Sequence, residues 1–214
     1  FTSCCPGWVR QVENYFPDLK ENLSSAKSPQ QIFGAAAKNY YPQIAGIAKE
    51  DVFVVTIMPC IAKKFESERE GMAGDIDAVL TTRELGQLIK ASKGLDGKRI
   101  KFEALEDSEA DRAMGEYTGA GTIFGVTGGV MEAALRTGKD FLEGFKNAKS
   151  ESLDYCAVRG LDGVKEAEVA ISAATGDEIS LKVAVVNGAA NFFELHKSGK
   201  LDSYHFVEVM ACPG

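Results

Sequence analysis

The chain has 214 residues, of which 45% are hydrophobic and 26% are charged, a composition ordinary for a globular protein of one domain or two lobes. Its net charge of -7, with acidic residues dispersed along the sequence, argues against a nucleic-acid partner. No apolar run approaches the roughly 20 residues of a membrane span. Because the chain begins at Phe1 without an initiator methionine, we interpret it as an internal part of a longer protein.

Five cysteines make an odd number for a disulfide framework, and two of them are adjacent. Three stand next to proline, in Cys5-Pro6, Pro59-Cys60 and Cys212-Pro213, which predicts three fixed turns that present thiolates. Soft thiolate ligands select iron–sulfur clusters, zinc or copper(I). Thiolates used in this way must stay unoxidised, so we expect a reducing compartment, the cytoplasm.

Alternating helix and strand patterns fill the first half of the chain. A helix is expected from Pro6, with an apolar stripe that includes Trp8 and Val12, and a second from Pro29, carrying Ile32 and Phe33. The β-branched run at residues 52–57 predicts a strand that stops at Pro59. A second strand is expected at 75–80, followed by a helix capped by Thr81 or Thr82 with Glu84 in its first turn.

The second half continues in the same style after a charge-rich stretch at 93–116, which we expect to cross the surface between two lobes. Glycine-rich residues 119–129 lack the lysine of a P-loop and lead into a helix at 130–136, with another helix around 141–145. Strands are expected at 155–158, 168–171, 181–186 and 204–210, and a helix at 189–197. Strands that alternate with helices predict an α/β fold with parallel sheets.

Chemistry in such folds lies outside the carboxyl ends of the strands. Cys60, Lys63 and Glu66 follow the end of the first strand, and Met210 and Cys212 lie at the carboxyl end of the last one. The alternative for Cys60 is a structural cysteine beside a solvated charged turn. Ligands spread from Cys4 to Cys212 do not have the compact spacing of a zinc site.

Three motifs, TSCCPGW at residues 2–8, MPCIAKKFE at 58–66 and EVMACPG at 208–214, resemble the three signatures of [FeFe]-hydrogenases in order and separation. The resemblance extends over the whole chain. It implies two lobes, each a mainly parallel sheet flanked by helices, with a metal cluster in the cleft between them. We place the first lobe at residues 1–105 and the second at 106–214.

The resemblance also implies a cofactor, the H-cluster, in which a [4Fe-4S] cubane is joined to a two-iron subsite with CO, cyanide and azadithiolate ligands. Cys5, Cys60 and Cys212 would ligate the cubane, and a bridging cysteine would lie two residues beyond Gly214. Cys4 and Ser24 would relay protons. Lys63 would hydrogen-bond a cyanide ligand and pair with Glu66. The residues that would line the subsite are Met58, Met210, Phe124 and Gln30.

The implied activity is reversible oxidation of H2 to protons and electrons, with ferredoxin or NADH-linked subunits as electron partners, maturation proteins for the subsite, and further iron–sulfur clusters upstream. Without the bridging cysteine, we expect the 214-residue piece itself to make no H2. The alternative is a hydrogenase-like carrier, assembly or interaction protein without the two-iron subsite. A third reading is a hydrogen sensor, and Cys4 argues against it because sensory relatives typically lack the relay cysteine.

Overall fold

The computed structural model describes residues 1–110, 114–116, 118–142, 156–157, 161–172 and 178–213. The backbone divides into two compact units, which are described separately: unit 1 is Phe1–Ser25 with Tyr117–Gly214, and unit 2 is Ala26–Glu116. None of the helices in the described part of the chain has both the length and the apolar character to cross a membrane.

The elements of unit 1 and their bounds are α1 (Pro6–Tyr15), the 3-10 helix η1 (Pro17–Asn22), α6 (Gly119–Ile123), α7 (Gly129–Leu142), β3 (Cys156–Ala157), β4 (Val164–Ser172), β5 (Glu178–Asn187), α8 (Ala189–Lys197), η4 (Leu201–Ser203) and β6 (Phe206–Met210). Those of unit 2 are α2 (Pro29–Asn39), α3 (Tyr41–Ala45), η2 (Lys49–Asp51), β1 (Val55–Met58), α4 (Ala62–Ser67), β2 (Ala78–Thr81), α5 (Thr82–Ala91) and η3 (Phe102–Ala104).

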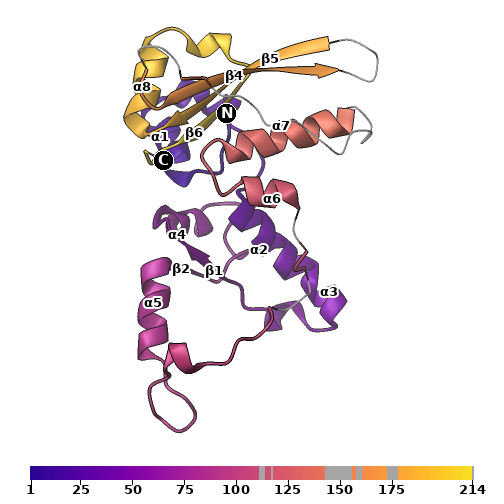
Figure 1. Ribbon diagram of the computed structural model, residues 1–214, viewed down its shortest axis with the longest axis vertical. Coiled ribbons are helices and arrows are strands. Elements are labelled where there is room, and N and C mark those ends of the chain that lie inside the picture. Colours follow the sequence, from indigo (N-terminus) through magenta and orange to yellow (C-terminus); the bar gives the residue numbers. More distant parts are fainter. Residues whose placement is uncertain (111–113, 117, 143–155, 158–160, 173–177, 214) are drawn as a thin grey trace. The chain divides into compact units, whose positions relative to one another are not determined.

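The sheet of unit 1 has the strand order β3-β4-β5-β6 (Figure 1). β5 pairs with β6 in parallel, from Val183 opposite Phe206 to Asn187 opposite Met210. β3–β4 and β4–β5 are antiparallel, so this sheet is mixed rather than mainly parallel. The reason is the connection, because only residues 173–177 separate β4 from β5, and a parallel crossover needs a dozen or more. The α/β class itself is confirmed.

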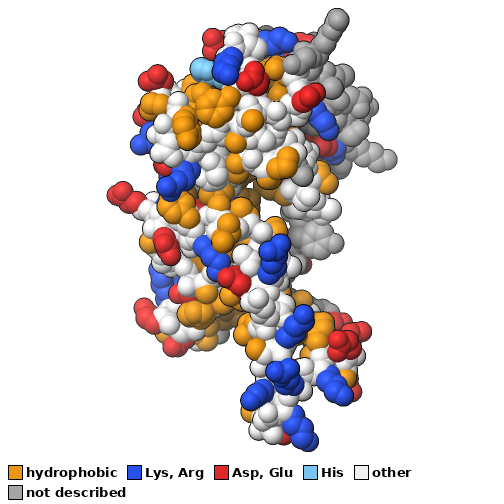
Figure 2. All heavy atoms as spheres, turned by 90° about the vertical axis from the view of Figure 1, so that its left-hand side faces the viewer, with side chains coloured by type: hydrophobic (Ala, Val, Ile, Leu, Met, Phe, Trp, Pro, Cys, Tyr) orange, Lys and Arg blue, Asp and Glu red, His pale blue; other side chains and the backbone are white. Residues whose placement is uncertain are grey.

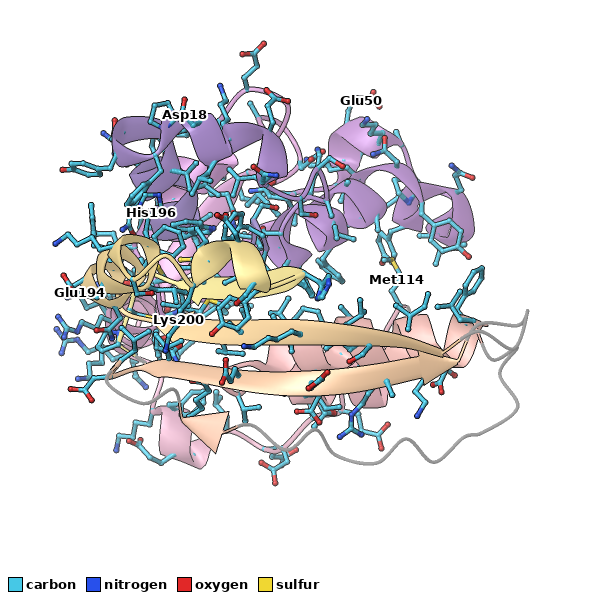
Figure 3. The ribbon with its side chains drawn as sticks, turned by 90° about the horizontal axis from the view of Figure 1, so that it is seen from above. Asp18, Glu50, Met114, Glu194, His196 and Lys200 are labelled. Carbon is cyan, nitrogen blue, oxygen red and sulfur yellow. The ribbon has the colours of Figure 1, made fainter. Side chains whose placement is uncertain are left out.

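Helices cover both faces of this sheet (Figure 1). On one face, Trp8 and Val12 of α1 pack with Phe192 and Leu195 of α8 against alternate residues of β5 and β6. On the other face, Met131 and Leu135 of α7 pack with Val183, Val185 and two β4 residues. The view from above shows α8 with His196 beside the helical N-terminal segment, where the rings of His196 and Phe16 lie 5.0 Å apart (Figure 3). The alternation along β5 therefore separates two cores.

The N-terminal segment belongs to unit 1 because its apolar partners lie near the other end of the chain. Trp8 is fully buried and its ring centroid is 4.3 Å from that of Phe192. The predicted division at 105/106 kept residues 1–25 with the segment that follows them, whereas the compact units separate after Ser25 and after Glu116. Local sequence patterns contain no signal for such a long-range contact.

Unit 2 is built on the parallel pair β1–β2, in register from Val55 opposite Ala78 to Met58 opposite Thr81. Its small core consists of Ala37, Val54, Ile76 and Val79. α2 turns a face of small and polar residues inward, and Gly34 lets the helix approach closely, since a Cβ there would lie 2.7 Å from the Asp75 carbonyl oxygen. The apolar residues expected to anchor this helix, Ile32 and Phe33, are exposed.

Several other large apolar side chains of unit 2 are also exposed, among them Phe53, Val55 and Ile57, which follow the two-residue repeat of β1. Figure 2 shows hydrophobic patches between lysine, arginine and acidic side chains on one face of the molecule. Other predicted bounds also shift. α7 is a single helix up to Leu142, and the rest of the helix expected around 141–145 lies outside the described residues. α2 ends at Asn39, and Pro42 lies in the first turn of α3.

Candidate functional site

The first cysteine motif is anchored to β6 in unit 1. Thr2 donates its N–H to the Val207 carbonyl at 3.1 Å, and its hydroxyl accepts the N–H of Val209 at 3.3 Å. The indole N–H of Trp8 donates to the Thr2 carbonyl oxygen at 3.1 Å. The threonine and the tryptophan of the motif therefore fix the backbone on either side of Cys4 and Cys5.

Cys5 is the N-cap of α1, with Pro6 at the first helical position. Its Sγ accepts two backbone N–H groups, from Trp8 and from Ala211, each at 3.4 Å. Both N–H groups point at the sulfur, and one of them belongs to the first turn of the helix. The surroundings of Cys5 therefore suit a thiolate that binds a metal.

The third motif ends β6 and lies against the first. The backbone of the turn is held by α8, because Gly188 donates to the Met210 carbonyl at 2.9 Å and Ala189 donates to the Ala211 carbonyl at 3.1 Å. Gly7 allows α1 to approach this turn, since a Cβ there would lie 2.9 Å from the Cβ of Ala211. The residue immediately before Cys212 thus donates to the sulfur of Cys5, and the exposed Cys212 thiol lies in the same part of unit 1.

The other two residues of the expected proton path also lie in unit 1. Cys4 is half-buried and immediately precedes the N-cap of α1. Ser24 is exposed, and its N–H donates to the Phe1 carbonyl at 2.9 Å, which places its backbone beside the start of the first motif. The structure therefore brings both residues to the N-terminal segment.

The glycine-rich segment is tied to β6 by a carboxylate at the start of the third motif, to which the sequence analysis assigned no role. Glu208 is fully buried, and its two oxygens accept the N–H groups of Gly128, at 3.1 Å, and Met131, at 2.7 Å. Burial raises the pKa of Glu208, and these two hydrogen bonds oppose the shift. Phe124, partly exposed at the end of α6, lies four residues before Gly128.

The second motif lies in unit 2. Met58 is the last residue of β1 and is half-buried, and the thiol of Cys60 is exposed in the turn that follows. Lys63 and Glu66 stand one turn apart on α4, and the Lys63 Nζ is 3.1 Å from both carboxylate oxygens of Glu66. Only 2% of Glu66 is exposed, so this ion pair is largely withdrawn from water.

Glu66 is also bonded to the start of α2. The Ser28 hydroxyl donates to its Oε2 at 2.8 Å, and the Gln30 Nε2 donates to the same oxygen at 3.3 Å. The Gln30 Nε2 also donates to the Lys63 carbonyl at 3.3 Å, and the Gln30 Oε1 accepts from the Thr56 hydroxyl at 2.9 Å. All five residues are buried or nearly so, and together they form one continuous polar network, the Glu66 network: Ser28, Gln30, Thr56, Lys63 and Glu66.

The predicted site residues fall into two sets. Unit 1 contains Cys4, Cys5, Ser24, Phe124, Met210 and Cys212, and unit 2 contains Gln30, Met58, Cys60, Lys63 and Glu66. Within either unit, the described residues form no group of three or more His, Cys, Asp or Glu side chains that could hold a metal ion. Sequence reasoning assigned no role to Ser28, Thr56 or Glu208, although Glu208 is the first residue of the third motif. The signal for Glu208 was present, as a lone carboxylate inside the apolar strand FVEVM.

An α/β fold with thiols at a helix N-terminus and beyond the ends of parallel strands defines a class of protein that can hold a metal cluster through cysteine sulfur. The whole chain, residues 1–214, matches the family described as the iron only hydrogenase large subunit, C-terminal domain. The chain belongs to this family.

Individual relatives agree. The chain is 60% identical to iron hydrogenase 1 of Clostridium pasteurianum over its full length, and covers 36% of that protein. It is 48% identical to the periplasmic [Fe] hydrogenase large subunit of Nitratidesulfovibrio vulgaris, of which it covers 49%. A more distant relative, 30% identical with 44% of its length covered, is named a probable cytosolic Fe-S cluster assembly factor of Aedes aegypti. The chain thus spans between about a third and a half of these relatives.

The fold has a solved counterpart. The structure matches a variant of the [FeFe]-hydrogenase HydA1 of Chlamydomonas reinhardtii with a TM-score of 0.79 and 36% identity. The match covers 100% of this chain and 59% of that one. The family takes its name from iron only hydrogenases, and the relatives of this chain include proteins named as hydrogenases and one named as a probable Fe-S cluster assembly factor.

Proposed function

We propose that the protein containing this chain catalyses the reversible interconversion of H2 with two protons and two electrons at an H-cluster. The observation that carries the proposal is the Lys63–Glu66 pair, one turn of helix beyond Cys60 in the second motif. Replacing a buried ion pair by apolar residues of similar volume is often neutral or stabilising, so stability alone gives no reason to keep one. We therefore attribute the Lys63 ammonium to the binding of a second anion, a ligand of the cluster.

The cysteines fit the cubane part of such a cluster. We propose Cys5, Cys60 and Cys212 as thiolate ligands, with a fourth cysteine two residues beyond Gly214. The two N–H donors to the Cys5 sulfur support this assignment, because hydrogen bonds to ligand sulfurs are one of the means by which proteins set cluster potentials. Cys60 and Cys212 are exposed thiols within their own units and are therefore accessible to a ligand.

When bound, the cluster would supply the redox chemistry: the cubane exchanges electrons and the two-iron subsite binds and splits H2. The protein's own groups would hold the cluster and move protons. The ammonium of Lys63, fixed by Glu66, would donate hydrogen bonds to a cyanide ligand. Met58, Met210 and Phe124 would form an apolar surround that limits the entry of water. The thiol of Cys4 would pass protons toward the subsite, with Ser24 the next group outward.

The second candidate function is that of a cluster assembly or carrier protein, which the name of the Aedes aegypti relative favours. Identity to that relative is half the identity to the Clostridium pasteurianum hydrogenase, 30% against 60%. Lys63, Cys4 and Phe124 have a use at a two-iron subsite and none at a cubane alone. The enzyme is therefore the better-supported proposal.

The partners follow from the chemistry. We propose a low-potential electron carrier such as ferredoxin, or NADH-linked subunits, further iron–sulfur clusters upstream in the full-length protein, and maturation proteins that deliver the subsite. We also propose the cytoplasm as the compartment, because three exposed or half-buried thiols, Cys5, Cys60 and Cys212, favour a reducing setting. Cell fractionation tests this assignment, since one relative is named as periplasmic.

Two adjacent lysines provide a matched test. Lys63 pairs with the buried Glu66, whereas Lys64 pairs with the more exposed Glu84. In the matured full-length protein, we expect Lys63→Met to lower H2 evolution from a reduced dye by at least about a hundredfold, the scale of one lost charge-assisted contact in a site closed to water. Lys64→Met should retain the activity of the unsubstituted protein. Equal activity in both variants would refute the role of Lys63.

A further inference from the structure

The amide of Gln30 has only one orientation that fits its surroundings. Only 3% of Gln30 is exposed, and two acceptors face the same end of its side chain, the Lys63 carbonyl and the Glu66 carboxylate, each at 3.3 Å. If the amide were turned over, its oxygen would face both of these oxygens. The NH2 group must therefore point toward α4, and the amide oxygen toward β1.

Thr56 completes this arrangement from the strand side. Its hydroxyl is 2.9 Å from the Gln30 Oε1, which can only accept, so the hydroxyl must donate. Thr56 is 8% exposed, and the alternation of β1 turns it inward while Val55 and Ile57 are exposed. The hydroxyl of one inward-facing strand residue thus selects the orientation of a buried amide.

The amide in turn holds α4 at two points. Gln30 bonds the backbone carbonyl of Lys63 and the side chain of Glu66, which are three residues apart on the helix. Ser28, the N-cap of α2, gives the Glu66 Oε2 a second donor. These donors hold the carboxylate in place, and the Lys63 Nζ lies 3.1 Å from both of its oxygens, so the direction of the Lys63 ammonium is set by groups on β1 and α2.

We propose that Thr56 and Gln30 are positioning residues that fix the Lys63 ammonium through Glu66. The proposal rests on the function proposed above, and it assigns Gln30 to holding α4 in addition to the subsite lining expected from the sequence. The bonds run from the Thr56 hydroxyl to the Gln30 amide, from the amide to the Glu66 carboxylate, and from the carboxylate to the Lys63 ammonium.

The test replaces the hydroxyl without changing the shape of the side chain. Thr56→Val removes the donor, Thr56→Ser restores it, and Thr82→Val removes a hydroxyl from an exposed position as a control. In the cluster-free full-length protein, acetylation of Lys63 by an amine-reactive ester is followed by mass spectrometry, with Lys64 as the internal reference. In the matured protein, the frequencies of the cyanide stretching bands are recorded for the same variants.

We expect Thr56→Val to raise the labelling rate of Lys63 about fivefold relative to Lys64, the effect of losing about one buried hydrogen bond, and to shift a cyanide band. Thr56→Ser and Thr82→Val should behave like the unsubstituted protein. Thr56→Val with unchanged Lys63 labelling and unchanged bands would overturn the proposal, even if the melting temperature falls, because a purely structural hydroxyl changes stability alone.

If Thr56→Val loses the circular dichroism signal of the folded protein, Gln30→Met is used in its place. This substitution keeps the length of the side chain without the amide, and we expect the same increase in the labelling of Lys63. Loss of folding in both variants would also overturn the proposal, because it would assign the network to the core of unit 2. If the unsubstituted matured protein has no CO or cyanide bands, the proposed function fails. The labelling result distinguishes that failure from failure of the positioning role.

Discussion

Replacing Glu66 by glutamine is the sharpest test of what the buried ion pair contributes to stability. The two side chains have nearly the same shape, so the substitution removes the charge and leaves the volume. In the structure, Glu66 accepts from Ser28 and Gln30 on Oε2 and pairs with Lys63 through both oxygens. An amide offers one acceptor oxygen and one NH2 group. Its NH2 group would face either the Lys63 ammonium or the donors of α2, and it has no charge to pair with Lys63.

The expected cost follows from this geometry. Removing one partner of a fully buried ion pair costs about 3 to 5 kcal/mol, because the remaining charge has no counterion. The Lys63 side chain is 14% exposed and keeps some contact with water, so we expect the free energy of unfolding to fall by about 2 to 4 kcal/mol. Lys63→Met in the same background should recover part of this loss, since it removes the unpaired ammonium.

Glu194 and Lys197 on α8 provide the control. Their N–O distance is the same 3.1 Å and their spacing is also three residues, but their side chains are 63% and 69% exposed (Glu194 is labelled in Figure 3). Glu194→Gln should cost no more than about 0.5 kcal/mol. Urea unfolding of the cluster-free protein, followed by circular dichroism, measures both substitutions. Equal losses for Glu66→Gln and Glu194→Gln would refute the reasoning.

Three further outcomes are expected. Gly34→Ala should lower the free energy of unfolding by about 1 to 3 kcal/mol, because the added Cβ overpacks the contact with Asp75. Gly86→Ala on α5, where a Cβ meets nothing within 4 Å, should raise the free energy of unfolding by up to about 1 kcal/mol. Urea titrations in which both substitutions change the stability in the same direction would contradict the packing. Glu208→Ala should speed hydrogen exchange of the two N–H groups at the start of α7 by at least tenfold relative to α8, and unchanged protection there would show that the carboxylate does not hold them. The backbone N–H of Thr81 and the Lys64 ammonium lower the pKa of Glu84 from 4.5 to about 2, so its stabilising effect is complete above pH 4.5 and is lost as the pH falls toward 2. Glu84→Gln should remove this part of the acid sensitivity of the melting temperature, and an unchanged pH profile would count against the capping box.

Local signals in the sequence predicted much of the fold. Pro6 and Pro29 mark the starts of α1 and α2, and Thr81 with Glu84 forms the capping box expected from those residues. The strands that carry Met58 and Met210 end where the sequence indicates. These features depend on residues within a few positions of each other, which is why sequence patterns can detect them.

Long-range packing was not predictable in the same way. Ile32 and Phe33 are the large apolar residues of the helical pattern expected from Pro29, but both are exposed, and Gly34 instead lies against the Asp75 backbone. The antiparallel pairing of β4 with β5 is determined by the length of their connection, which the strand patterns alone do not give. In each case the contact is made by a segment distant in the sequence or by the backbone. The spacing of hydrophobic residues carries no information about either kind of contact.

The residues of the candidate site also differ in whether the sequence could identify them. The cysteines, Lys63 and Glu66 were found through their motifs, and the pairing of Lys63 with Glu66 agrees with the expectation. Thr56 and Glu208 were given no role, because the hydrogen bonds of a strand threonine and of a lone carboxylate in an apolar strand depend on partners that the sequence does not identify. Buried polar groups must be hydrogen-bonded, and only the structure identifies the partners.

The most direct test of the central claim is an infrared spectrum of the matured full-length protein in the region between the protein bands, recorded together with H2 evolution from a reduced dye. The account predicts CO and cyanide stretching bands accompanied by H2 production, with the bands kept and the turnover lost in Cys4→Ala. A [4Fe-4S] signal without those bands and without H2 would contradict it and would favour the cluster assembly protein.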